Sequence, residues 1–128
     1  MVAIRRRQTR RALAGQHDTT GYEVLDVVEA AEQAGDEATV TTVAAALAVD
    51  QPRASKLVAK AVEAGLVRRV ADQADGRRAL LVRTAKGREA SAEVHRTRQA
   101  RFEAAMVDWS DVERAEFARL LSRFVEAL

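Results

Sequence analysis

The residues best suited to chemistry in this sequence are basic, and they gather in its middle third. Residues 51–83 hold eight basic side chains against three acidic ones, although the net charge of the whole chain is only +2. A run of charge is most often a solvated surface of mixed sign. Positive charge at this density is also what the phosphates of a nucleic acid attract. The sequence therefore contains a candidate phosphate-binding face.

Several of these side chains fall on a predicted helix from Gln51 to Ala64. Asp50 can cap it, proline is tolerated in its first turn, and Gly65 ends it. Its apolar residues share one face. The opposite face carries the candidate DNA-binding residues Gln51, Pro52, Arg53, Ser55, Lys56 and Lys60. Arginine can bond guanine through two hydrogen bonds, glutamine can read adenine or bind a phosphate, and serine and lysine are suited to phosphates.

A hairpin with arginines at its tip follows this helix. Residues 69–83 read RVADQADGRRALLVR, in which Asp75-Gly76 is a strong turn sequence between two apolar runs. Arg77 and Arg78 lie beside this turn. Arginine is favoured in the DNA minor groove, where negative potential is concentrated. We therefore expect both arginines to contact DNA.

Further helices are predicted on either side of this region. Amphipathic spacing predicts helices over 22–34 and from Thr39 through Ala48, a long helix from Ala85 toward Met106, and a last helix opened by Ser110. A short basic helix is predicted over residues 5–16. The fold class is mostly α with a small β-hairpin, in one domain spanning residues 1–128. A short helix, a tight turn, a helix with a basic face and then a hairpin is the order of a winged helix-turn-helix.

Residues 40–87 closely resemble the multiple antibiotic resistance regulator (MarR) family. The shared features are Leu47–Asp50, Ser55–Val58, Gly65–Arg69, the wing motif Asp72-x-x-Asp75-Gly76-Arg77, and Thr84-x-Lys86-Gly87. The resemblance implies a winged-helix DNA-binding lobe at about residues 22–84. It also implies dimerisation helices at about 1–20 and 85–128, and a homodimer whose wings straddle a roughly palindromic operator.

Two details of the DNA-binding residues depend on this resemblance. In similar proteins the wing aspartate orients the arginine that enters the minor groove, so Asp75 is expected to hold Arg77; the alternative is that Asp75 only shapes the turn. Pro52 and Arg53 stand where small hydroxyl residues are common in the family, so the operator sequence cannot be transferred from a relative.

The last helix has a wide apolar stripe at the end of a small chain. Little surface is left within one chain to cover it, which favours a second copy as the partner. Packing on its own core is the alternative. The stripe consists of Phe117, Leu120, Leu121, Phe124, Val125 and Leu128.

An effector site is expected on the resemblance, since pockets in the family lie between the dimer helices and the DNA-binding lobe. His17, Tyr22, Arg98 and Phe102 are the candidate residues, for an anionic aromatic ligand. The predicted helix at the N-terminus is shorter than is usual in the family, which weakens this assignment.

Other classes of function have little support in the residues. The chain has two histidines and no cysteine, so no cofactor or metal is expected. No catalytic motif is present, and enzyme activity is not expected. With no signal sequence or apolar run of about 20 residues, we expect a cytoplasmic protein that does not enter a membrane.

The leading hypothesis is a sequence-specific transcriptional regulator, a homodimeric repressor of a palindromic operator that a small molecule releases. The alternative is a winged-helix module that binds protein without specific DNA binding. A third hypothesis is a metal-responsive regulator.

Overall fold

The computed structural model describes residues 20–128, which divide between two compact units, one ending at Ser91 and one running from Ala92 to Leu128. Each unit is described by itself. The helix predicted over residues 5–16 and the candidate His17 lie outside the described residues.

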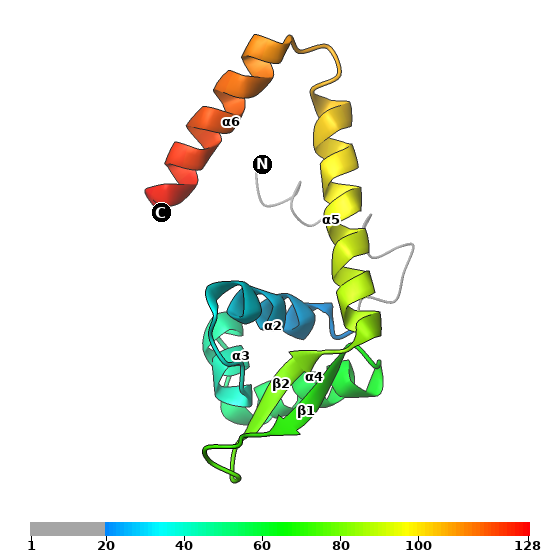
Figure 1. Ribbon diagram of the computed structural model, residues 1–128, viewed down its shortest axis with the longest axis vertical. Coiled ribbons are helices and arrows are strands. Elements are labelled where there is room, and N and C mark those ends of the chain that lie inside the picture. The colour runs from blue at the N-terminus through cyan, green and yellow to red at the C-terminus, as the bar shows by residue number, and fades with distance from the viewer. Residues whose placement is uncertain (1–19) are drawn as a thin grey trace. The chain divides into compact units, whose positions relative to one another are not determined.

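The elements confirm a mostly helical fold with one β-hairpin (Figure 1). In chain order they are α2 (Tyr22–Ala34), α3 (Val40–Leu47), α4 (Gln51–Glu63), β1 (Val67–Ala71), β2 (Ala79–Arg83), α5 (Ala85–Ala105) and α6 (Asp111–Glu126). The boundary between the two units falls inside α5.

Side chains that the sequence identified as caps begin three of these helices. The Thr39 and Ser110 hydroxyls accept from the amides of Thr42 and Glu113 in capping boxes. Asp50 Oδ1 accepts from the amide of Arg53 at 2.8 Å. Each cap satisfies an N–H group that has no partner within the helix, which is why the predicted starts of α3, α4 and α6 are confirmed.

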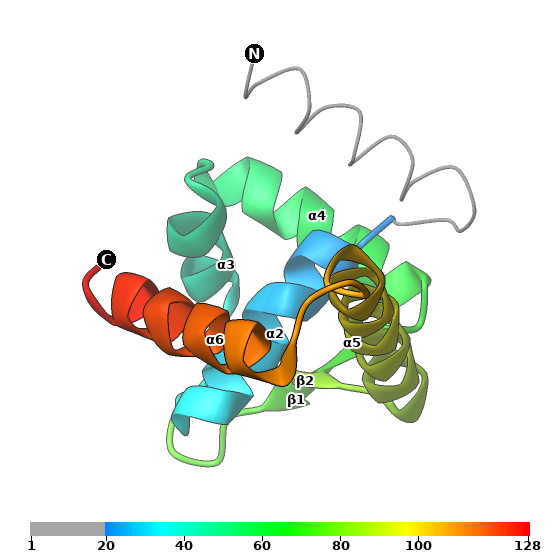
Figure 2. The ribbon, with the colours of Figure 1, turned by 90° about the horizontal axis from the view of Figure 1, so that it is seen from above.

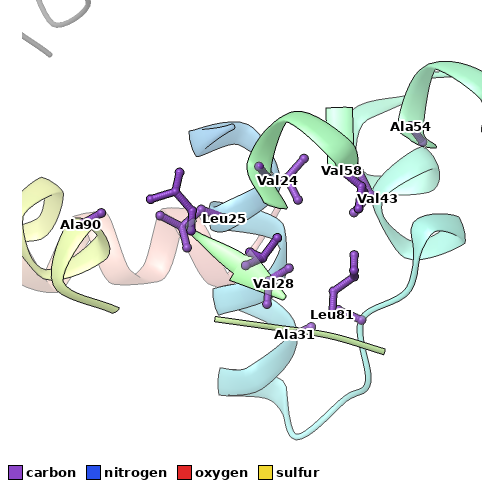
Figure 3. Close-up of a cluster of buried hydrophobic side chains, with 13 residues drawn as sticks. Val24, Leu25, Val28, Ala31, Val43, Ala54, Val58, Leu81 and Ala90 are labelled. Atoms are coloured by element: carbon purple, nitrogen blue, oxygen red, sulfur yellow. The ribbon is translucent and has the colours of Figure 1, made fainter. Parts of the chain in front are cut away.

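The core of the first unit lies between α2, α3, α4 and the hairpin (Figure 3). The three helices run in clearly different directions around it (Figure 2). Val24, Leu25 and Val28 of α2 are almost fully buried, with Val43 of α3 and Val58 of α4. The helical spacing of this segment predicts one buried stripe through Leu25 and Val28. Because α2 contacts both helices and β2, its buried face is wider than this stripe and includes Val24.

The helical spacing of residues 22–34 predicts Glu29 on the outer face of α2, with the other acidic residues of this segment, and for Glu29 the prediction is wrong. Only 8% of the residue is exposed. Strand β2 crosses α2, and the Glu29 carboxylate forms an ion pair with Arg83 at the end of this strand.

The hairpin pairs β1 with β2 in antiparallel register from Val67↔Arg83 to Ala71↔Ala79. The connecting loop, residues 72–78, is longer than the tight Asp75-Gly76 turn that the sequence suggested, and it projects beyond the strands (Figure 1). An isolated bridge, Ala38↔Leu81, adds a further pairing on the open edge of β2 that the sequence did not predict.

The capping box of α6 leads to a prediction about pH. Hydrogen bonds from the backbone and the side chain of Ser110 lower the pKa of Glu113. A lowered pKa in the folded state gives stability that is complete above the unfolded pKa and is lost as pH falls through the folded value. We expect Ser110→Ala to cost about 1 kcal/mol at neutral pH, and less in acid, in thermal unfolding of the full chain. Ser122→Ala, at an exposed position within α6, is the matched control and should not destabilise.

Candidate nucleic-acid interface

The outer face of α4 carries the residues that the sequence assigned to DNA binding. All six residues that the sequence assigned to it are exposed, namely Gln51, Pro52, Arg53, Ser55, Lys56 and Lys60. The Asp50 carboxylate caps this helix and offsets the partial positive charge of its N-terminus, so the positive charge of this face comes from Arg53, Lys56 and Lys60. Gln51 Nε2 also lies 3.3 Å from Thr41 Oγ1 of α3. This face combines base-reading and phosphate-binding side chains on one helix.

The opposite face of α4 holds the helix in place. Ala54, Val58 and Ala61 are completely buried. Gly21 allows the close approach at one end, since a Cβ there would lie 2.8 Å from Cα of Ala61. Small residues on the buried side therefore let α4 sit deep in the unit, while its long side chains point outward.

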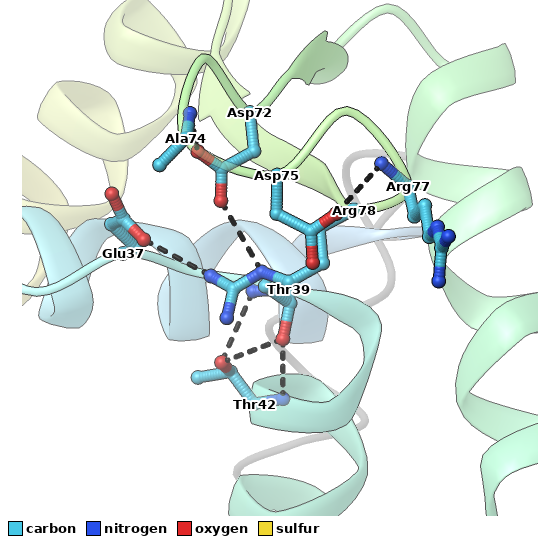
Figure 4. Close-up of polar contacts among 8 residues, drawn as sticks. All are labelled: Glu37, Thr39, Thr42, Asp72, Ala74, Asp75, Arg77 and Arg78. Atoms are coloured by element: carbon cyan, nitrogen blue, oxygen red, sulfur yellow. Dashed lines mark hydrogen bonds and ion pairs between the residues drawn. The ribbon is translucent and has the colours of Figure 1, made fainter.

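The wing loop, residues 72–78, is shaped by carboxylates that accept backbone hydrogen bonds. Asp72 Oδ1 accepts from the Ala74 amide at 2.9 Å, and Asp75 Oδ1 accepts from the Arg77 amide at 3.1 Å. Asp75 thus contacts Arg77 through its main chain, which is the geometry expected of a residue that shapes the turn. The side chain of Arg77 extends away from the other labelled residues (Figure 4).

The two wing arginines differ in their surroundings. Arg78 Nη2 lies 3.0 Å from Glu37 Oε2, and its Nε lies 3.4 Å from Asp72 Oδ2 (Figure 4). Glu37 precedes α3 and Asp72 follows β1, so Arg78 connects the wing to the loop between α2 and α3. The sequence did not suggest this contact.

Comparison with known proteins matches this lobe to one family. Residues 20–78 match the profile of the MarR family. The lobe is a MarR-family winged helix.

Solved structures with this fold extend the similarity to most of the chain. A MarR family protein from Bacillus stearothermophilus has a TM-score of 0.79 at 21% identity, covering 98% of this chain and 86% of its own. A single-residue mutant of MepR from S. aureus has 0.73 at 18%, covering 99% and 93%. The transcriptional regulator BldR from Sulfolobus solfataricus has 0.63 at 22%, covering 99% and 91%. Comparison with curated protein sequences gives no significant match.

Arg83, at the end of β2, connects the hairpin to α2 through ion pairs with Glu29 and Glu32. This part of the hairpin lies beyond residues 20–78, which match the MarR family. Arg83 Nη1 lies 2.8 Å from Glu29 Oε2, and Nη2 lies 2.8 Å from Glu32 Oε2. The side chains of Arg83 and Glu29 are only 16% and 11% exposed. Sequence analysis missed this network, although alternation along the strand puts Arg83 on the same face as the buried Leu81.

Three of the candidate effector residues are described by the structure, one in the MarR-family lobe and two in the C-terminal unit. Tyr22 is half-buried against the lobe core. Arg98 and Phe102 are exposed and lie one turn apart on α5. With His17 outside the described residues, the effector site stays a prediction.

The apolar stripe predicted on the last helix is exposed in the single chain. Phe117, Leu120, Leu121, Phe124, Val125 and Leu128 all expose more than a third of their surface, and α6 has no buried residue. Trp109 packs edge-on against Phe117, with 5.3 Å between ring centroids. The dimerisation role of this stripe stays a prediction.

Residues 20–128 contain no group of three or more histidine or acidic side chains placed to hold a metal ion. Nor does any helix in this part of the chain have the length and apolar character needed to cross a membrane.

Proposed function

We propose that this chain is a sequence-specific DNA-binding transcriptional regulator that represses a palindromic operator as a homodimer. Regulators of the MarR family bind DNA and act as dimers. The observation that carries the proposal is the outer face of α4, where Arg53, Ser55, Lys56 and Lys60 are exposed together on a helix of the size that the major groove accepts. Arg77 on the wing supplies a side chain for the neighbouring minor groove.

The exposed stripe of α6 supports the homodimer. A contiguous set of large apolar side chains on one helix is unusual on a monomer and is typical of an interface. Two-fold symmetry of the protein would then match a palindromic operator.

Release by a small molecule is the third part of the proposal. The expected effector is an anionic aromatic compound, and Tyr22, Arg98, Phe102 and His17 are the residues that we propose for its recognition. A ligand with unequal affinity for two spacings of the lobes shifts their populations and so changes operator affinity.

Selection of bound genomic fragments by the purified full-length chain, followed by sequencing, tests the proposal. We expect one palindromic motif, bound with an affinity that falls steeply with salt. Equal binding of selected and random duplex at moderate salt would contradict the regulator. A stable protein partner held by the α4 face, with no DNA footprint, would indicate the protein-interaction module instead.

Loss of Arg53 should weaken operator binding by about 1–3 kcal/mol, because a base-reading arginine makes two hydrogen bonds to guanine. Arg53→Ala is measured by fluorescence anisotropy on the selected duplex, and its melting temperature should equal that of the parent since the side chain is exposed. Arg119→Ala is the matched control: it removes the same charge from α6, where Arg119 pairs with Glu116. Equal loss in both variants would indicate a general charge effect.

A further inference from the structure

We infer that Arg78 is a positioning residue of the wing and not one of its DNA contacts. By binding Glu37 and Asp72 together, it holds the wing loop in the shape that directs Arg77 outward. The inference rests on the proposed DNA binding and assigns different tasks to two adjacent arginines.

The first argument is the set of bonds that converge on Arg78. Its guanidinium uses two different nitrogens, Nη2 at 3.0 Å from Glu37 and Nε at 3.4 Å from Asp72. Its backbone is bound as well, since its carbonyl accepts from the Asp72 amide at 3.1 Å and its amide donates to the Asp75 carbonyl at 3.0 Å. Arg78 therefore joins both ends of the wing loop.

The second argument is the burial of Asp72. Its side chain is only 9% exposed, and the two partners of its carboxylate are the Ala74 amide on one oxygen and Arg78 on the other. A buried carboxylate needs a charged or hydrogen-bonding partner. If Arg78 swung out to a phosphate, Asp72 would lose its cationic partner, which favours retention of the contact.

The third argument is where Glu37 lies. It precedes Ala38, whose carbonyl accepts from the Leu81 amide at 2.8 Å, and Thr39, which caps α3. Glu37 and Arg78 are 60% and 50% exposed, so this pair alone contributes little stability. Its effect is to connect the tip of the wing to the segment that starts α3 (Figure 4).

The alternative role for Arg78, a phosphate contact that Glu37 holds only in the free protein, predicts effects of opposite sign. If Glu37 competes with DNA for Arg78, Glu37→Gln tightens binding. If Glu37 positions the wing, the same substitution weakens it. Asp36→Asn is the matched control, since it removes a charge from the neighbouring exposed residue.

The experiment measures operator affinity of full-length variants at several salt concentrations. Arg78→Lys keeps the charge but cannot span two carboxylates. We expect it to weaken binding about two- to thirtyfold, the range for substitutions that act through other residues, with an unchanged salt slope. Lys60→Ala, which removes an expected phosphate contact, should lower the slope by about 1. Glu37→Gln should weaken binding and Asp36→Asn should not. Parental affinity in Arg78→Lys, or tighter binding by Glu37→Gln than by Asp36→Asn, would overturn the inference.

Hydrogen exchange of the free protein distinguishes failure of this inference from failure of the proposed function. We expect the amides of Asp72 and Ala74 to exchange faster in Arg78→Lys and Glu37→Gln, and at the parental rate in Asp36→Asn. If the parent prefers no DNA sequence, the proposed function fails, whatever the exchange rates. If the parent binds its operator but these amides exchange at parental rates in both variants, only the role of Arg78 is overturned.

Discussion

Gly87→Ala is expected to destabilise the DNA-binding lobe by about 3 kcal/mol, at the upper end for an added methyl group in a packed interior. A Cβ at this position would lie 2.0 Å from the carbonyl oxygen of Leu66 and 3.2 Å from Cδ1 of Leu25. The Leu66 carbonyl cannot simply move, because it accepts from the backbone amide of Thr84 at 3.1 Å. To relieve the clash, the first turn of α5 would have to move away from Leu66, the residue that precedes β1.

Helix propensity acts in the opposite direction at Gly87 and is the smaller effect. Alanine is favoured over glycine within a helix by about 1 kcal/mol, so propensity alone predicts a more stable protein. Urea unfolding of the full-length variant decides between the two. Gly76→Ala is the control, since no atom lies within 4 Å of a Cβ there and its φ is not positive. An unchanged midpoint for Gly87→Ala would contradict the close packing of α5 on Leu66.

Arg83→Met is expected to cost about 2–3 kcal/mol, somewhat less than breaking a fully buried ion pair because Arg83 keeps some contact with water. Methionine keeps an apolar stem but removes the guanidinium, which leaves the Glu29 carboxylate in its buried position without the arginine. The loss should appear in urea unfolding as a lower midpoint with the same slope.

A double-mutant cycle with Glu29→Gln identifies the origin of that loss. We expect a coupling of at least about 1 kcal/mol, as for residues that share one charged network. Arg69→Met, at an exposed position on the paired strand β1, is the matched control and should change stability by less than about 0.5 kcal/mol. Equal losses in Arg83→Met and Arg69→Met would show that the network with α2 adds nothing to stability.

Arg83 of β2 and Arg78 of the wing loop lie at opposite ends of the hairpin. Arg83 fastens the base of the hairpin to α2, and Arg78 connects its tip to the loop before α3. Arg77 lies beside Arg78 at the tip. A wing held at both ends enters a groove with less loss of conformational entropy than a free loop would.

The sequence by itself determined where three helices begin, α3 and α4 in the lobe and α6 in the C-terminal unit, and which face of α4 points outward. Capping by Thr39, Asp50 and Ser110 acts over three residues, and a helix repeats its faces every three or four, so both can be recognised within a short segment. The exposed residues of α4 follow directly from this periodicity.

Tertiary structure alone decided which distant groups meet. Arg78 and Glu37 are 41 residues apart, Arg83 and Glu29 are 54 apart, and Gly87 lies against Leu66 through a turn of the chain. Charge patterns placed Glu29 outside because a helix without its neighbours has only one evident apolar face. Because β2 crosses α2, it buries a second face of that helix, which includes Glu29. Arg83 of β2 compensates the desolvation of the Glu29 carboxylate, and the local periodicity of the sequence could not predict that pairing.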